Sequence, residues 1–122
     1  MQKDEVLELK ANLEMFIGSE DYHWHRMGQF SFTDGVKYLA DKAQCYWLID
    51  IVGSYLIDSK IRELPFQVWE LKVNEDSSAK VTMREDTDLP VVVEQEIPFT
   101  DFPLDGIKLY FTQGILMLVT EY

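Results

Sequence analysis

The two histidines of the chain lie two positions apart in residues 21–26, "DYHWHR". On a β-strand, residues two apart point to the same face, so His23 and His25 could share a metal ion, with Asp21 as a third ligand. Zinc sites usually need three or four ligands, and the sequence offers no further histidine and a single cysteine. The ligand count therefore favours an alternative, in which the imidazoles make ordinary hydrogen bonds at the rim of a sheet. In that alternative the neighbouring apolar side chains pack on the sheet: Tyr22, Trp24 and Met27.

A second combination of residues could form a ligand-binding or enzymatic pocket. Arg26 lies among aromatic residues, where a guanidinium can stack on a ring and offer a forked donor to a carboxylate or phosphate. Asp50 interrupts the apolar segment "YWLIDIVGSY", and a buried carboxylate must be paired, so Arg26 is its candidate partner unless Asp50 points outward. In the enzymatic version His25 is the general base or a metal ligand, Arg26 anchors an anion and Asp50 orients the base. The ligand-binding version combines Arg26 with three aromatic side chains: Tyr22, Trp24 and Trp47.

Other catalytic chemistry finds little support. Cys45 is the single cysteine, which excludes an intrachain disulfide, and its place early in an apolar helix is more typical of a core residue than of a nucleophile paired with histidine. The sequence contains no nucleophile elbow, phosphate-binding loop, dinucleotide fingerprint or EF-hand loop. The pattern thus indicates no cofactor and leans against an enzyme.

Length and charge narrow the class of protein. A chain of 122 residues, 47% of them hydrophobic, predicts a single domain over residues 1–122. The net charge of −11 repels phosphate backbones and anionic membranes, which disfavours direct nucleic-acid binding. No apolar run reaches the ~20 residues that span a bilayer. The lone cysteine and the absence of an export signal at the N-terminus predict a cytoplasmic location.

The acidic residues concentrate in residues 74–105. Nine acids and two bases, Lys80 and Arg84, give this stretch seven net negative charges. It could face a basic partner, or it could be a solvated face that keeps the protein soluble. The nine acids are Glu75, Asp76, Glu85, Asp86, Asp88, Glu94, Glu96, Asp101 and Asp105.

Two helices and a hairpin are expected in the first half of the chain. Apolar residues at helical spacing predict an amphipathic helix over residues 3–17, ended by Gly18. Apolar and polar residues alternate on both sides of Asp34-Gly35, which predicts a hairpin turning at that pair. A helix over residues 34–45 is the alternative, because the apolar residues there also fit helical spacing. With Asp41 as its N-cap, a central apolar helix follows in residues 41–57, "DKAQCYWLIDIVGSYLI".

The rest of the chain predicts strands. Apolar and polar residues alternate in "FQVWELKV", "AKVTMRE", "PVVVEQEIPF" and "IKLYFTQGILMLVTEY", with a tight turn at Gln113-Gly114 and prolines that confine residues 97–106 to a loop or sheet edge. Short sequential connections favour antiparallel pairing. The expected fold is α+β: a mainly antiparallel sheet of five to seven strands packed against a central apolar helix, with an N-terminal amphipathic helix. The hairpin at Asp34-Gly35 would place the imidazole pair at the margin of this sheet.

Several segments resemble a known family. "FTDGVKYLA", "YWLIDIVGSY", "PFQVWELKV", "TDFPL", "LYF" and "TEY" occur in this order, and the similarity runs from about Gly18 to Tyr122. The chain resembles an uncharacterised bacterial family of small stand-alone proteins known only as a domain of unknown function. The resemblance implies one intact domain and supplies no activity, cofactor or site residue.

Three functions remain open from the sequence. The leading one is a small acidic interaction or accessory protein in the cytoplasm that binds a basic protein partner. The second is a ligand-binding protein or enzyme with a pocket around His25, Arg26 and Asp50. The third is a protein that self-associates, as a homodimer, through an apolar patch on the second face of its sheet. The residues expected in that patch are Val92, Tyr110, Leu116 and Leu118.

Overall fold

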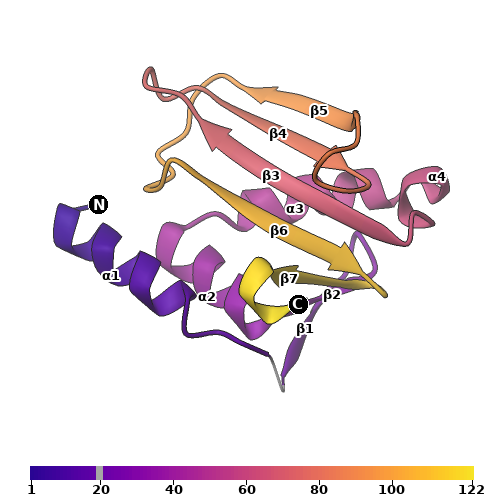
Figure 1. Ribbon diagram of the computed structural model, residues 1–122, viewed down its shortest axis with the longest axis horizontal. Coiled ribbons are helices and arrows are strands. Elements are labelled where there is room, and N and C mark those ends of the chain that lie inside the picture. Colours follow the sequence, from indigo (N-terminus) through magenta and orange to yellow (C-terminus); the bar gives the residue numbers. More distant parts are fainter. Residues whose placement is uncertain (19–20) are drawn as a thin grey trace.

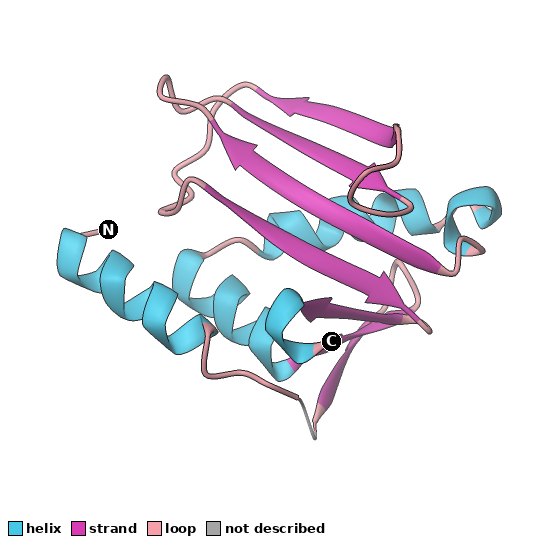
Figure 2. Cartoon of the chain, in the orientation of Figure 1, coloured by secondary structure: helices cyan, strands magenta, loops and turns pink. Residues whose placement is uncertain are grey.

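A computed structural model describes residues 1–18 and 21–122 of the chain. A seven-stranded sheet forms one layer and the helices lie on one of its faces, so the predicted α+β class is confirmed (Figures 1 and 2). The elements in chain order are α1 (Lys3–Leu13), β1 (Tyr22–His25), β2 (Phe30–Thr33), α2 (Asp34–Ala43), α3 (Tyr46–Leu56), α4 (Ser59–Arg62), β3 (Phe66–Val73), β4 (Ala79–Arg84), β5 (Val91–Ile97), β6 (Gly106–Thr112), β7 (Ile115–Leu118) and the 3₁₀ helix η1 (Val119–Glu121).

The strands follow the order β1-β2-β7-β6-β3-β4-β5. Every neighbouring pair is antiparallel except β2 and β7, which run parallel, so the sheet is mainly antiparallel as predicted. The turn between β6 and β7 is the predicted one, because Gln113 and Gly114 both have positive φ values, of 53° and 76°, that suit a two-residue hairpin. The edge strands are β1, of four residues, and β5, of seven.

The predicted hairpin at Asp34-Gly35 is wrong. The structure turns earlier, at residues 26–29, and β1 pairs with β2 from Tyr22↔Thr33 to His25↔Phe30. Asp34 and Gly35 begin helix α2 instead, with Thr33 as the N-cap whose side chain accepts a hydrogen bond from the Val36 amide at 3.3 Å. The Thr-Asp pair is thus a helix start signal, and it prevails over the Asp-Gly turn signal.

The central helical region divides differently from the prediction. Asp41 is not an N-cap, because it lies inside α2, which ends where Gln44 adopts the left-handed conformation with φ of 51°. The apolar helix α3 then begins at Tyr46, with Cys45 in the N-cap position. The N-terminal helix is present, but it is shorter than predicted and ends at Leu13 rather than near Gly18.

One core lies between the sheet and the helices. Helix α3 buries Val52 and Leu56 completely against strand residues such as Trp69, and α1 adds Leu9 and Leu13 to the same cluster. Helix α3 lies behind the sheet in Figure 1, and Tyr122, which follows η1, packs against Phe66 and Tyr110 of the strands. No helix of the described residues is long and apolar enough to cross a membrane.

The apolar patch expected on the second face of the sheet is only partly correct. Leu116 and Leu118 are buried in the core, at 0% and 3% exposure, so they are not part of any patch. Val92 is 47% exposed, and Tyr110 packs with Phe66 and Tyr122 through ring contacts of 5.0 and 5.4 Å. The aromatic side chains there partly cover one another.

Candidate functional site

Strand β1 places the two histidines on one face, as their spacing predicted. Its residues alternate between exposed and half-buried positions, with His23 and His25 on the half-buried side that faces the helices. The neighbouring apolar side chains do not pack on the sheet as the alternative expected: Tyr22, Trp24 and Met27 are 52%, 63% and 52% exposed.

Histidine 25 is held in a polar clamp between the β1–β2 turn and helix α3. Its Nε2 lies 2.8 Å from Oδ1 of Asp50, and its Nδ1 accepts a hydrogen bond from the Gly28 amide at 2.9 Å. Its ring stacks on Phe30 with 4.8 Å between the centroids. A β-carbon at Gly53 would lie 2.6 Å from Cε1 of His25, so α3 approaches the ring closely only because position 53 is glycine.

These contacts fix the tautomer of His25. A backbone amide can only donate, so Nδ1 must carry a lone pair, and the proton of the neutral ring therefore sits on Nε2 and points to Asp50. Both ring nitrogens are thus engaged in intramolecular bonds. Acting as a general base, or binding a metal, would require His25 to give up the bond to Gly28 or the bond to Asp50.

The arginine of the clamp is Arg62, which no pattern in the sequence predicted as a site residue. It donates from Nη1 to the carbonyls of Gly28 and Leu56, at 2.6 and 3.1 Å, and from Nη2 to the carbonyl of Gln29. Its charge thus lies at the C-terminal end of α3, where a cation is favourable. Arg26, the arginine expected to pair with Asp50, is exposed in the turn, and Asp50 pairs with His25 instead.

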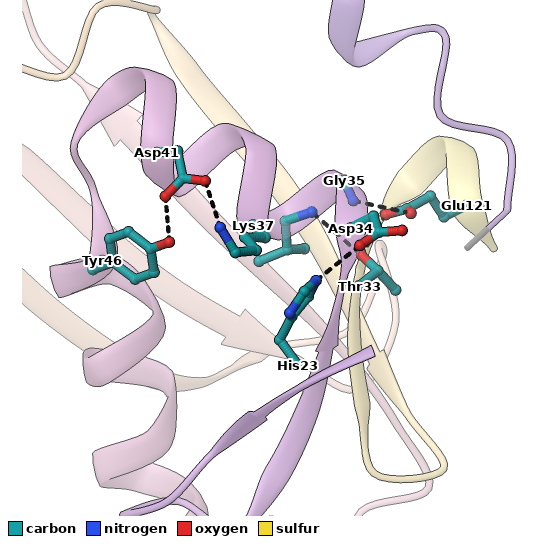
Figure 3. Close-up of polar contacts among 9 residues, drawn as sticks. His23, Thr33, Asp34, Gly35, Lys37, Asp41, Tyr46 and Glu121 are labelled. Atoms are coloured by element: carbon teal, nitrogen blue, oxygen red, sulfur yellow. Dashed lines mark hydrogen bonds and ion pairs between the residues drawn. The ribbon is translucent and has the colours of Figure 1, made fainter. Parts of the chain in front are cut away.

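Histidine 23 joins β1 to the first turn of α2. Its Nε2 lies 2.8 Å from Oδ1 of Asp34, and the side chains of this pair are 31% and 39% exposed (Figure 3). Each histidine therefore faces one carboxylate from a different helix. Within residues 1–18 and 21–122, no three His, Cys, Asp or Glu side chains are grouped so that they could hold a metal ion.

The N-terminal end of α2 is also bound by the end of the chain. Glu121 accepts hydrogen bonds from the hydroxyl of Thr33 at 2.6 Å and from the amide of Gly35 at 3.3 Å (Figure 3). It also accepts a hydrogen bond from the amide of Leu118 at 2.9 Å. A carboxylate at this place satisfies free helix amides and opposes the positive end of the helix dipole. The "FTDG" and "TEY" segments, far apart in the sequence, therefore form one capping device.

A third polar group connects α2 to α3. Asp41 accepts hydrogen bonds from Lys37 at 2.8 Å and from the Tyr46 hydroxyl (Figure 3). The Lys37 bond, followed by the Tyr46 bond, holds the pKa of the Asp41 carboxyl below its ordinary value. The hydrogen bond to Asp41 in turn raises the pKa of Tyr46, and it raises the pKa of Lys37. These groups are exposed enough that solvent weakens their attraction.

The predicted ligand-binding residues do not all meet. Tyr22, Trp24 and Arg26 lie on β1 and its turn, whereas Trp47 lies on α3 and lines a groove of about 480 Å³ beside strand β5. None of the first three lines that groove. Its walls come from α3, from the end of β5 and from the following loop: Trp47, Ile51, Gln95, Glu96, Ile97, Pro98, Phe99, Thr100 and Asp101.

The acidic stretch runs from the turn after β3, through β4 and β5, to the start of β6. It comprises strands β4 and β5 with the loops that precede and follow them, and all nine of its carboxylate residues are exposed. Lys80 pairs with Glu94 at 2.6 Å, while Arg84 donates to the backbone carbonyl of Leu89. Glu94 and Glu96 lie on β5 itself and five other acids lie in the turns at the ends of β4, whereas Asp101 and Asp105 lie in the segment that leads back to β6. We call residues 74–105 the acidic edge.

Cysteine 45 lies in the core, as its apolar surroundings suggested. It is 1% exposed, and burial raises the pKa of its thiol to about 12. Its Sγ lies 3.7 Å from the carbonyl of Leu39, and neither histidine contacts it among the described contacts. A thiol in this state is a poor nucleophile at neutral pH.

Comparison with known proteins assigns the chain to a protein family. The sequence profile of a family of unknown function, DUF6876, matches residues 7–122. The chain belongs to this family. The match to DUF6876 confirms the resemblance to a domain of unknown function and extends it into α1. No curated protein and no solved structure matches the chain, so its membership of DUF6876 brings no activity with it.

Proposed function

We propose that this protein is a small cytoplasmic interaction protein that binds a basic protein partner along its acidic edge. The observation that carries the proposal is the exposure of nine carboxylates within residues 74–105, of which one, Glu94, pairs with a lysine or arginine among the described residues. Such a field attracts cationic surfaces and speeds their association.

Apolar exposure on the same edge distinguishes a binding surface from a merely solvated one. Phe99 is 71% exposed, Val92 47% and Leu89 44%, and all three lie among the acids of residues 74–105. A surface that serves solubility alone carries few exposed large apolar side chains and no large apolar patch. Apolar side chains surrounded by charge are typical of protein interfaces.

Two variants of equal charge test this proposal. The edge variant carries Glu85→Gln, Asp86→Asn, Glu94→Gln and Glu96→Gln, and the control variant carries Asp4→Asn, Glu5→Gln, Glu8→Gln and Glu14→Gln near α1. Each loses four negative charges, which takes the net charge from −11 to −7. Proteins captured from a lysate by the wild type and the control, lost with the edge variant, and released between 50 and 300 mM salt would support the proposal. Equal capture by both variants, or capture insensitive to salt, would contradict it.

A ligand-binding or enzymatic role at His25, Arg26 and Asp50 is the second candidate. The contact between His25 and Asp50 favours it, since a carboxylate that orients an imidazole is a common catalytic pair. The bond from Gly28 to the other ring nitrogen and the exposed position of Arg26 favour a structural role for the same residues. Structural and catalytic roles predict different outcomes for Asp50→Asn: a change in stability alone, or loss of an activity at unchanged stability.

Self-association through the second face of the sheet is the third candidate. Its support is the apolar side chains exposed there, among them Val92 on β5 and Trp24 on β1, at 47% and 63% exposure. Sedimentation velocity between 10 and 500 μM decides it. A homodimer would sediment faster as the concentration rises, and a constant monomer value would reject this role.

A further inference from the structure

Strand β5 is an open sheet edge next to an apolar groove. It pairs with β4 on one side, and no strand of the described residues occupies its other side. Alternate residues of such a strand therefore present free N–H and C=O groups outward. The groove of about 480 Å³ beside Trp47 begins at Gln95 and continues through Phe99 to Asp101.

We propose that the basic partner binds as an extended segment, added as an eighth strand along β5, with one apolar side chain in the Trp47 groove. This inference rests on the proposed function and specifies its site and the form of its ligand. Added strands gain affinity from backbone hydrogen bonds and specificity from pockets for alternate side chains. Here β5 supplies the backbone hydrogen bonds, and the groove beside Trp47 supplies a pocket for a side chain.

The two faces of β5 determine the pattern of the ligand. Glu94 and Glu96 point to the sheet face opposite the helices, as shown by their register with Thr82 and Lys80. Gln95 points to the helix side, where it accepts a hydrogen bond from Tyr55 at 2.9 Å. A strand added beside β5 therefore presents basic side chains toward the two glutamates and, at alternate positions, apolar side chains toward the groove.

Charge selects this ligand over a second copy of the chain. Two β5 strands paired edge to edge would bring the Glu94 and Glu96 carboxylates of both copies near one another, and like charges across strands are destabilising. Lys80 neutralises Glu94 at 2.6 Å, which leaves Glu96 and, in the groove, Asp101 without an ion pair among the described residues. Lysine or arginine at the alternate positions that share the face of Glu94 and Glu96 complements Glu96, while Asp101 lies on the groove side.

Phe99, which lines the groove, allows its role in binding to be tested by substitution. Its side chain is 71% exposed, so Phe99→Ala removes binding surface with little effect on folding. Trp24, 63% exposed on the opposite edge strand β1, is the control. For a nine-residue peptide that alternates lysine with valine around a central leucine, we expect Phe99→Ala to weaken binding about tenfold and Trp24→Ala to leave it unchanged.

Peptide chemistry tests the added strand. N-methylation of alternate amides blocks one edge of the peptide at a time, so one of the two N-methylated patterns should abolish binding while the other keeps it. Titration calorimetry at 50 mM salt gives the affinities, and amide chemical shifts locate the site. A control peptide of the same composition, with lysines and apolar residues in two blocks, should bind at least tenfold more weakly.

The results distinguish strand addition at β5 from simple electrostatic attraction to the acidic edge. Equal binding of the alternating, block and both N-methylated peptides overturns strand addition and leaves attraction to the acidic edge intact. Strand addition at β5 is also overturned if Trp24→Ala rather than Phe99→Ala removes binding, because the site then lies on β1, at the edge opposite β5. If none of the basic peptides binds at 50 mM salt, strand addition fails, while the lysate test above still decides the proposed function independently.

Discussion

Replacing Gly53 by alanine should destabilise the wild-type protein but stabilise a variant in which His25 is replaced by alanine. Gly53 lies inside α3, where alanine is favoured over glycine by about 1 kcal/mol. The new β-carbon, however, would lie 2.6 Å from Cε1 and 3.0 Å from Nδ1 of the His25 ring. Displacing the packed His25 ring costs about 1–3 kcal/mol, and each of its hydrogen bonds that is lost, to Asp50 or to Gly28, costs about 1 kcal/mol more.

The balance gives a net destabilisation of about 1–3 kcal/mol for Gly53→Ala in the wild type. In the His25→Ala background the nearest remaining atom is Cε1 of Phe30 at 3.3 Å, which can yield slightly. There the helix preference dominates, and Gly53→Ala should stabilise by about 0.5–1 kcal/mol. The sign of the substitution therefore changes between the two backgrounds.

Urea denaturation followed by far-UV circular dichroism measures all four proteins of this cycle. The slope with urea should stay constant, so that differences in midpoint report stability. In thermal unfolding, 1 kcal/mol corresponds to about 4 °C for a chain of this length. If Gly53→Ala destabilises both backgrounds equally, the His25 ring is not what the new β-carbon meets, and the clamp between the β1–β2 turn and α3 is refuted.

Three further predictions concern the polar and buried groups. Glu121→Gln should lower the free energy of unfolding by about 1 kcal/mol, because it weakens the charged cap of α2. Thr120→Ala, at the exposed neighbouring position, is the control and should leave the stability nearly unchanged. Urea denaturation midpoints compare the two variants. Cys45 should resist iodoacetamide at pH 8 in the folded protein and react as urea unfolds the chain, because burial raises the pKa of its thiol to about 12. Mass spectrometry follows the reaction. Rapid labelling of the folded protein would contradict the burial of Cys45. The Asp41 network should lose its contribution at both ends of the pH range. The pKa of Asp41 is lowered by folding, so its contribution is present above the unfolded value of 3.8 and disappears as the pH falls through the lower folded value; the pKa of Tyr46 is raised, so its contribution is present below 10.0 and disappears as the pH rises through the folded value. Ultraviolet titration of Asp41→Asn should show Tyr46 ionising at lower pH than in the wild type, and an unchanged titration would rule out the contact.

Strand periodicity made most of the sheet predictable. Alternation identified β3, β4, β5 and the β6–β7 pair, and Gln113-Gly114 identified a turn, because these features depend on neighbours in the sequence. The Asp34-Gly35 error arose from two local signals in conflict. Thr33 and Asp34 are helix N-terminal residues, and the carboxylate that completes the cap comes from Glu121 at the other end of the chain. Sequence alone could not reveal that contact.

The candidate site shows the same division between local and distant contacts. Strand spacing correctly placed His23 and His25 on one face. Their partners Asp34 and Asp50 lie on two helices, and Arg62 lies on a third. No pattern in the sequence identified Arg62, because its ligands are backbone carbonyls, which every residue carries. The Trp47 groove likewise depends on packing of α3 beside β5.

Hydrogen exchange of strand β5 in the presence of the alternating lysine–valine peptide tests most directly where and how a basic segment binds. Binding along the acidic edge by an added strand predicts slower exchange at alternate amides of Val91–Ile97, those that point away from β4, with no change in Tyr22–His25 of the opposite edge. Slowed exchange confined to β1 or α1, with β5 exchanging as in the free protein, would contradict it.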